Sequence, residues 1–364
     1  MNPFTLKYNS DFFCDRENEI QYLKDNITNG RDTLIHSPRR LGKSALIHHL
    51  FHLLEKEDTY ETLFIDLFAT NNLEGLIKSL GESILNKYHK KNLLTGIKKL
   101  FKGLHASLSL SADGSPQLGL SITESQINPG LDQLLQYLEN RKKIVIVALD
   151  EFQQVATYPE NAEAILRTII QQLNNVYFIY SGSSNHILQN MFYSAKQPFY
   201  QSSESLVLDK IDSDKYTKFI NWCFESNNKT ITIEAINHFL DFTQSYTYYT
   251  QVICNQAFYK CDSTMNFDQA VQITNNYIET RKLDYLNIYN LLSENQKKVI
   301  AAIAKEGIVS KPSSVKFMIK HKLPSSSSTL QALGALDTKE LIYKTIKGYR
   351  VYDVFFNRFL ERYF

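Results

Sequence analysis

The sequence predicts an α/β fold with a parallel sheet, followed by an all-α region and a winged helix-turn-helix domain. Three observations support this fold class. Five short apolar runs alternate with helical patterns over about the first 210 residues, and this alternation is typical of a parallel sheet covered by helices. Helical patterns alone continue to about residue 289. The remaining sequence combines three helical patterns with two short strands, which is the outline of a winged helix.

Composition limits the classes of protein that need to be considered. The chain has 364 residues, of which 43% are hydrophobic and 21% charged, so it can bury a large core and is not of the disordered class. A net charge of +2 neither favours nor excludes nucleic acid. The four cysteines form no CxxC pair, and the sequence shows no signal peptide and no long apolar run. We therefore expect a soluble cytoplasmic protein without a zinc site.

The first domain is expected to span residues 1–210 and to contain five strands. The inner runs are almost continuously apolar, as expected for strands that are covered on both faces. The runs are Thr33–His36, Thr62–Phe68, Ile144–Asp150, Val176–Gly182 and Ser205–Ile211.

One segment interrupts the alternation of strands and helices. Leucines alternate with serines on both sides of Asp113-Gly114, which predicts a β-hairpin inserted at about residues 105–125. The preceding residues 87–103 are basic and amphipathic. They are interpreted either as a solvated helix face or as a contact with a membrane surface or nucleic acid.

The second half of the chain is expected to hold a helical lid at residues 211–288 and a winged helix at residues 289–364. The presumed recognition helix is rich in Ser, Leu and Ala, and its main donors beyond the serines are Gln331 and Lys339. Base readout normally uses Arg, Lys, Asn or Gln. The domain is therefore interpreted as a lid or protein-docking module, with DNA binding as the alternative. We expect it to pack on the lid through three C-terminal aromatic residues, Phe355, Phe356 and Phe359.

A phosphate-binding pattern follows the first strand. The stretch SPRRLGKS lies between a strand and a helix, which is the context of a P-loop, although Ser37 replaces the first glycine of G-x-x-x-x-G-K-[ST]. Loop N–H groups and the helix N-terminus attract phosphate. Lys43 is expected to reach the β and γ phosphates, and Ser44 to bind Mg²⁺. The predicted nucleotide-binding residues here are Ser37, Pro38, Arg39, Arg40, Leu41, Gly42, Lys43, Ser44 and Ala45.

The third apolar run ends in two carboxylates. Asp150 and Glu151 close the stretch IVIVALDE, which has the form of a Walker B motif. Asp150 is predicted to hold Mg²⁺, and Glu151 to polarise the attacking water. The alternative is a pair of exposed acids that cap the next helix. A metal with a triphosphate would supply the counter-charge that buried carboxylates need.

A hydroxyl at the end of the fourth strand is a further candidate. Ser181, with Ser183 behind it, lies in the stretch YFIYSGSSN and is predicted to position the attacking water. Serine and glycine are also ordinary turn residues, so a plain strand-to-helix turn is the alternative.

Taken together, "FFCDRENEIQYL", "SPRRLGKS", "FIDLF", "LDEFQ" and "SGSS" resemble the archaeal-type P-loop ATPase family. This family groups with the AAA+ and STAND ATPases and is similar in plan to the origin-recognition ATPases. The resemblance implies an ATPase core of the AAA+ (ASCE) type, a helical lid and a winged helix over nearly the whole chain. It also implies that Asp15 and Arg16, with Glu17, form a box that contacts the nucleotide base.

Two positions depart from the pattern of that family. Gln201 stands where an arginine is usual, and Thr247 stands where the lid usually carries proline. Arginine-assisted hydrolysis is worth about 10³–10⁵ in rate, so we expect weak turnover unless Arg167 substitutes. A structural surface role is the alternative for Arg167.

These inferences predict a Mg-dependent ATPase that converts ATP and water to ADP and phosphate. ATP and Mg²⁺ are the expected ligands; Glu151, Lys43 and Ser181 are the expected catalytic residues; Ser44 and Asp150 are the expected metal ligands. The nucleotide is expected to drive a conformational switch that acts on an unidentified protein partner. The alternatives are a non-hydrolysing nucleotide switch and an ATP-gated DNA-binding regulator.

Overall fold

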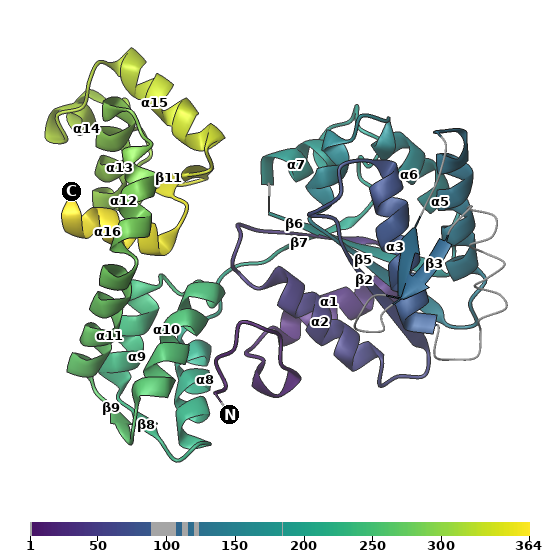
Figure 1. Ribbon diagram of the computed structural model, residues 1–364, viewed down its shortest axis with the longest axis horizontal. Coiled ribbons are helices and arrows are strands. Elements are labelled where there is room, and N and C mark those ends of the chain that lie inside the picture. Colours follow the sequence, from purple (N-terminus) through teal and green to yellow (C-terminus); the bar gives the residue numbers. More distant parts are fainter. Residues whose placement is uncertain (1, 89–106, 111–115, 120–123, 184) are drawn as a thin grey trace. The chain divides into compact units, whose positions relative to one another are not determined.

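The computed structural model of the protein describes residues 2–88, 107–110, 116–119, 124–183 and 185–364 (Figure 1). The chain divides into two compact units. One comprises Tyr8–Lys210, and the other comprises the residues up to Lys7 together with Ile211–Phe364. Most of the basic stretch 87–103, from residue 89 onward, lies outside the described residues, and so do Asp113 and Gly114. We keep the three domain ranges given above as a proposal.

The unit Tyr8–Lys210 is built on a five-stranded sheet of order β2-β5-β6-β1-β7, with parallel pairing throughout. The five predicted strands are confirmed, although the second begins and ends two residues earlier than expected and the last one ends four residues earlier. The strands are β1 Thr33–His36, β2 Tyr60–Asp66, β5 Ile144–Asp150, β6 Val176–Gly182 and β7 Glu204–Val207. Because the strands run parallel, the loops that follow β1, β5 and β6 all leave the same edge of the sheet.

Helices cover both faces of this sheet (Figure 1). Val145, Val147 and Leu149 of β5 belong to a core cluster with residues of α3, α5, α6 and α7, while Ile146 and Ala148 are buried outside that cluster. This two-residue alternation is expected for a strand that is buried on both sides. The helices are α1 Glu17–Thr28, α2 Lys43–Leu54, α3 Leu73–Tyr88, α5 Glu124–Glu139, α6 Ala162–Ile170 and α7 Asn185–Tyr193.

Two further strands lie in the stretch for which a hairpin was predicted. β3 Ser107–Leu110 pairs antiparallel with β4 Pro116–Gly119, and Leu108 lies opposite Leu118. These strands form a two-stranded sheet of their own.

The other unit begins with five helices. They are α8 Ser213–Glu225, α9 Ile233–Phe242, α10 Thr247–Lys260, α11 Phe267–Thr280 and α12 Lys282–Asn290. The expectation that this region lacks strands was wrong, because β8 Thr230–Ile231 pairs parallel with β9 Thr264–Met265. Two-residue strands are too short to show an alternating sequence pattern.

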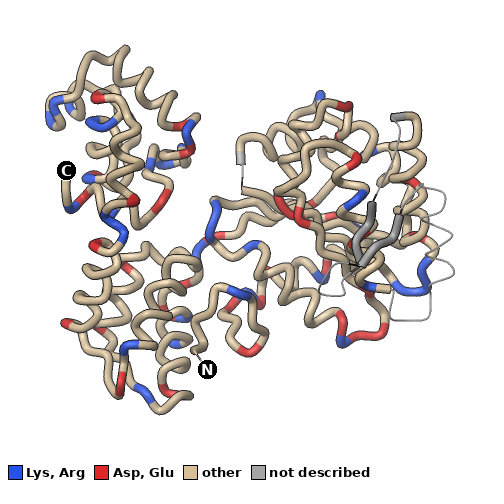
Figure 2. The backbone as a smooth tube through the Cα atoms, in the orientation of Figure 1, with Lys and Arg blue, Asp and Glu red and all other residues tan. Residues whose placement is uncertain are grey.

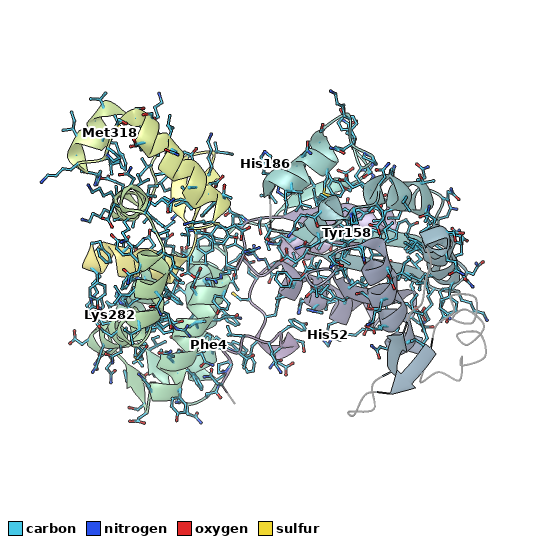
Figure 3. All side chains as sticks on the ribbon, turned by 45° about the horizontal axis from the view of Figure 1, so that its top comes forward. Phe4, His52, Tyr158, His186, Lys282 and Met318 are labelled. Carbon is cyan, nitrogen blue, oxygen red and sulfur yellow. The ribbon has the colours of Figure 1, made fainter. Side chains whose placement is uncertain are left out.

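The N-terminal residues pack on these helices. Phe4, labelled in Figure 3, is only 2% exposed, and its ring centroid lies 5.9–6.4 Å from those of Phe219, Phe224 and Phe258. The Asn255 side chain donates a 2.7 Å hydrogen bond to the Phe4 carbonyl. The chain therefore passes between the two units twice, after Lys7 and after Lys210.

The C-terminal residues form a winged helix. Its elements are α13 Glu294–Glu306, α14 Val315–Lys320, α15 Ser326–Thr338, β10 Ile342–Thr345, β11 Gly348–Val351 and α16 Val354–Tyr363. β10 and β11 pair antiparallel, as predicted for the wing.

Helix α16 packs on the lid as the sequence predicted. The Phe355 ring centroid lies 4.7 Å from that of Tyr249 and 4.4 Å from that of Tyr277. Phe356 and Phe359 both pack against Tyr285. Apolar burial of this size is worth roughly 1.5–3 kcal/mol per side chain. Helix α16 and the lid helices therefore stabilise each other.

The half-buried residue Asp32 lies at the edge of the sheet where β1 begins. Asp32 accepts hydrogen bonds from the Phe178 N–H (2.8 Å) and the Tyr180 hydroxyl (3.3 Å). Burial raises the pKa of Asp32 from 3.8 to about 6, although both hydrogen bonds and Arg167 oppose this shift. The stabilising contribution of the protonated group is therefore complete below pH 3.8 and is lost as the pH rises through 6.

Replacing Asp32 by Asn should stabilise the protein at neutral pH. The amide keeps an acceptor for Phe178 N–H and removes the buried charge. We expect the free energy of unfolding at pH 7 to rise by about 1–3 kcal/mol and the gain to disappear near pH 4. Urea denaturation at both pH values measures this, with exposed Asp262→Asn as the control. A variant less stable than wild type at pH 7 would contradict the view that the ionised Asp32 carboxylate destabilises the folded protein.

Candidate functional site

The loop between β1 and α2 holds the phosphate-binding pattern. It runs from Ser37 to Gly42, and α2 begins at Lys43. Arg40 (φ 73°) and Gly42 (φ 93°) both adopt left-handed backbone conformations, which turn the chain sharply into the helix. No side chain caps the N-terminus of α2. Its first N–H groups and its partial positive charge therefore face the loop, as an anion site requires.

Lys43 is held within this loop. Its side chain is buried, and Nζ donates to the Ser37 carbonyl (3.1 Å), the Ser37 hydroxyl (3.3 Å) and the Pro38 carbonyl (3.3 Å). Burial lowers the pKa of Lys43 to about 8, while the nearby Glu151 and Asp150 oppose this shift. The ammonium group therefore lies between the loop and the two carboxylates.

Asp150 joins three separate segments of the chain. It ends β5, is 6% exposed, and accepts a 2.5 Å hydrogen bond at Oδ2 from the Ser44 hydroxyl at the start of α2. Its Oδ1 accepts hydrogen bonds from the Ser181 hydroxyl at the end of β6 and from the Glu151 N–H (3.1 Å). The alternative of two exposed acids does not apply to Asp150, because its carboxylate is buried and hydrogen-bonded.

Glu151 lies beside Asp150 in a left-handed conformation (φ 55°). Its Oε2 accepts hydrogen bonds from the Gln153 amide and from the Ser183 hydroxyl (3.2 Å). Arg39 Nε in turn donates to Ser183 Oγ (3.1 Å). The structure thus places Ser183 against Glu151 and the fully buried Ser181 against Asp150.

Two of these contacts were missed by sequence reasoning. Gln153 was not singled out, although it lies two residues after Glu151, and Arg39 was not connected to Ser183, which is 144 positions away in the sequence. Parallel strands bring the residues after β1 and β6 to one edge, so the proximity of Arg39 and Ser183 could have been foreseen. The sequence does not indicate in which direction each side chain points.

The remaining predicted nucleotide-binding residues are spread around the loop. Leu41 is buried, Ala45 and Pro38 are half-buried, and Arg40 is exposed. Arg16 is 4% exposed, and its guanidinium donates to Glu19 Oε1 (2.7 Å) and to the Asp209 carbonyl (2.6 Å). These bonds tie the start of α1 to the residues after β7. Neighbouring Asp15 is half-buried with φ 59°. Contact of Asp15 and Arg16 with a base stays a prediction.

The donor set at Asp150 suits magnesium. Mg²⁺ prefers hard oxygen ligands and commonly takes only one or two from the protein, with phosphates and water completing the shell. Ser44 Oγ and Asp150 Oδ2 supply two adjacent oxygens. No cluster of three or more His, Cys, Asp or Glu side chains able to hold a metal occurs among the described residues. A site completed by phosphate oxygens needs no such cluster.

Arg167 lies on α6, close enough to Asp32 to lower its pKa. Asp32 precedes β1, whereas the loop of Lys43 follows it. The substitution of Arg167 for the usual arginine, and its alternative structural role, stay predictions. Gln201 is exposed with φ 50°, and its N–H donates to the Phe192 carbonyl (3.1 Å).

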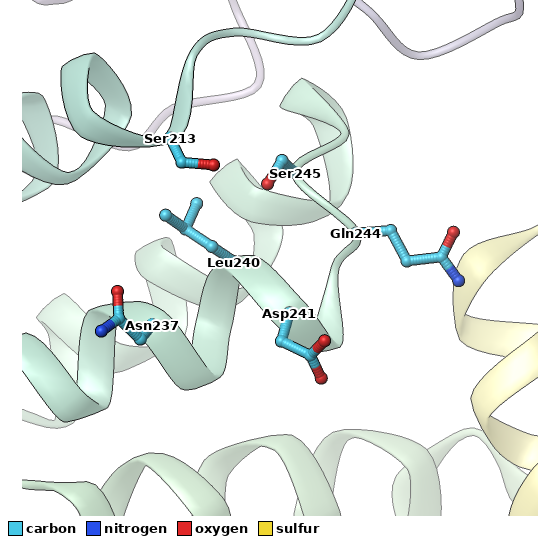
Figure 4. Close-up of a pocket in the computed structure, with 6 residues that line it drawn as sticks. All are labelled: Ser213, Asn237, Leu240, Asp241, Gln244 and Ser245. Carbon is cyan, nitrogen blue, oxygen red and sulfur yellow. The ribbon is translucent and has the colours of Figure 1, made fainter.

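A pocket occurs in the other unit, within the lid (Figure 4). None of the residues predicted from the motifs lines it. Two of its residues are engaged by the winged helix, since Arg358 donates to the Asp241 carbonyl (2.6 Å) and Arg350 donates to Gln244. The lining residues are Ser213, Asn237, Leu240, Asp241, Gln244 and Ser245.

Two protein families match the chain. Residues 13–245 match the family described as "ATPase domain predominantly from Archaea", and residues 283–362 match "probable winged helix domain". An uncharacterised ATP-binding protein of Methanocaldococcus jannaschii is 22% identical over 338 residues, which cover 85% of this chain and 90% of that protein. No helix of the described residues is long and apolar enough to cross a membrane.

Solved structures share the fold over nearly their whole length. The Walker-type ATPase of Pyrococcus abyssi has a TM-score of 0.67 at 18% identity, with 98% of this chain and 99% of that chain covered. The ORC2 protein of Aeropyrum pernix, solved as ADPNP–ADP complexes, has a TM-score of 0.59 at 14% identity (99% and 95% covered). The ORC1 protein of that organism, solved in complex with DNA, has 0.56 at 11% (99% and 96%). The predicted fold class is confirmed.

Proposed function

Because this chain belongs to the family of ATPase domains found predominantly in Archaea, we propose that it binds Mg-ATP and hydrolyses it to ADP and phosphate. One observation carries the proposal: the Ser44 hydroxyl at the P-loop helix and the buried Asp150 lie in hydrogen-bond contact, with Lys43 and Glu151 on either side. These are the residue types that bind a metal–triphosphate, and the fold brings them together from positions a hundred residues apart.

Each residue has a distinct role in the proposed reaction. The loop 37–42 and the first turn of α2 cradle the phosphates, and Lys43 leaves its loop carbonyl partners to bind the β and γ phosphate oxygens. Ser44 and Asp150 hold Mg²⁺. The metal, when bound, neutralises charge on the phosphates. Glu151 orients a water and accepts its proton as the water oxygen bonds to the γ phosphorus and the bond to the bridging oxygen of ADP breaks.

The proposed consequence of hydrolysis is a change in the lid and winged helix. These regions form one unit, stabilised by α16 and by the Arg358 and Arg350 contacts. We propose that this unit moves as a body about the two crossings after Lys7 and Lys210, and that a protein partner senses the movement. The absence of the usual arginine at Gln201 favours slow turnover.

Duplex DNA is the alternative partner, because ORC1 of A. pernix was solved with DNA. In this chain the exposed residues of α15 include Ser326, Ser327, Leu330, Gln331 and Asp337, and α15 carries no Lys or Arg (Figure 2). Lys339 stands at the C-terminal end of α15 and donates to Gln296 Oε1 (3.3 Å). This helix offers little to phosphates or to base edges, so we favour a protein partner.

Lys43→Ala should weaken Mg-ATP binding by about 100-fold, since two charge-assisted hydrogen bonds of ~1.5 kcal/mol each would be lost. The fold should persist, because the hydrogen bonds that the Lys43 ammonium makes to described residues all go to its own loop. Titration calorimetry measures the affinity, with Lys56→Ala, an exposed lysine just after the end of α2, as the control. Equal Mg-ATP affinity in the Lys43→Ala variant and wild type would show that this loop is not the phosphate site.

Glu151→Gln should keep Mg-ATP affinity and reduce turnover by roughly 10²–10⁴-fold, the usual contribution of a general base. Phosphate release under saturating Mg-ATP measures turnover, and exposed Glu57→Gln is the control. Unchanged phosphate release would remove Glu151 from the mechanism. A wild-type protein that binds Mg-ATP without releasing phosphate would support the non-hydrolysing switch instead.

The protein should bind duplex DNA only weakly. We expect dissociation constants near the non-specific range of about 10⁻⁴–10⁻⁶ M at physiological salt, with or without Mg-ATP. Fluorescence anisotropy across a salt series measures this. Sub-micromolar, sequence-selective binding would promote the DNA-regulator alternative over the protein switch.

A further inference from the structure

Two adjacent glutamines follow Glu151 but have different surroundings. Both lie in the short 3₁₀ segment Phe152–Thr157. Gln153 is 6% exposed, and its amide contacts Glu151. Gln154 is half-buried, and its backbone N–H donates a hydrogen bond to the Glu151 carbonyl (3.0 Å). The pair therefore offers one glutamine aimed at Glu151 and one matched neighbour that is not.

The orientation of the Gln153 amide is determined by Glu151. An ionised carboxylate only accepts hydrogen bonds, so the Gln153 Nε2 group must face Glu151 Oε2. This leaves Gln153 Oε1 buried, and no described residue donates a hydrogen bond to it. A buried amide oxygen without a donor destabilises a protein, and such an exception requires an explanation. The hydrogen bond to Glu151 is the compensating feature.

Gly182 makes this arrangement possible. A Cβ atom added there would collide with Gln153 Oε1 and would lie 3.2 Å from Gln153 Cδ and 2.9 Å from Leu188 Cδ1. Gly182 has no left-handed backbone that would otherwise explain the glycine. The glycine between Ser181 and Ser183 therefore serves to admit the Gln153 amide.

The hydrogen bonds select one oxygen of Glu151. Gln153 and Ser183 both donate to Oε2, one from two residues after Glu151 and the other from the end of β6, and Arg39 in turn donates to Ser183. Neither donor engages Oε1. With Oε2 fixed by two donors, Oε1 is the oxygen that can accept a proton from water.

We propose that Gln153 is a positioning residue for Glu151, and that Gly182 provides the space for it. The inference rests on the proposed function, because it assigns to Gln153 the orientation of the group that activates water. Gln153 itself touches neither nucleotide nor metal in this account. Its loss should therefore affect the rate of hydrolysis and leave nucleotide affinity intact.

The test compares Gln153→Met, which keeps side-chain size without the amide, with Gln153→Ala and the control Gln154→Ala. We expect both Gln153 variants to release phosphate roughly 10- to 100-fold more slowly, the effect of one hydrogen bond to a charged group. Their dissociation constants for Mg-ATP should stay within about 3-fold of wild type, which also reports that the site is folded. Gly182→Ala should show the same pattern, and Gln154→Ala should match wild type.

A second comparison separates positioning from general stability. In a Glu151→Gln background, adding Gln153→Met should cause no further loss of turnover, because residues that act as a unit are non-additive. A full additional loss there, or Gln153 variants that hydrolyse like Gln154→Ala, would overturn this inference while leaving the proposed function in place. A wild-type chain that binds Mg-ATP but never hydrolyses it would overturn both.

Discussion

The hydrogen-bonded carboxylate of Asp150 is the interaction on which the site depends. Its position follows from sheet order: β6 lies between β5 and β1, so the residues after all three strands leave one edge together. A carboxylate buried at this edge is unfavourable unless donors surround it, and Ser44 and Ser181 supply them. A one-residue slip of β5 would turn Asp150 away. The register of β5 in the sheet therefore determines whether the Asp150 carboxylate lies in the site.

The sequence motifs predicted which residues would lie together at the ends of the strands. Lys43, Ser44 and Asp150 follow strands at spacings that a P-loop protein needs, and the order of apolar runs predicted the strands themselves. The sequence did not predict which serine would face which carboxylate. Ser181 was the candidate for positioning the water, with Ser183 behind it, and the structure places Ser181 against Asp150 and Ser183 against Glu151.

Features that depend on contact between distant side chains were also beyond the sequence pattern. Gly182 was predicted only as the last residue of a strand, with a plain turn as the alternative for this stretch, but the structure gives it a steric role toward Gln153. Phe4 carries no motif, yet it joins the lid because its ring packs against three aromatic rings there. The aromatic residues of α16 were predicted correctly, because their density near the chain end indicates a buried face.

The central claim is that the loop 37–44 and Asp150 together form a Mg-ATP site. A crystal structure of the protein with Mg²⁺ and a non-hydrolysable ATP analogue tests it most directly. The account predicts the β and γ phosphates within the loop, in contact with Lys43, and the metal bound by Ser44 Oγ beside Asp150. An analogue ordered elsewhere on the protein, or one in the loop with its metal away from both Ser44 and Asp150, would contradict it.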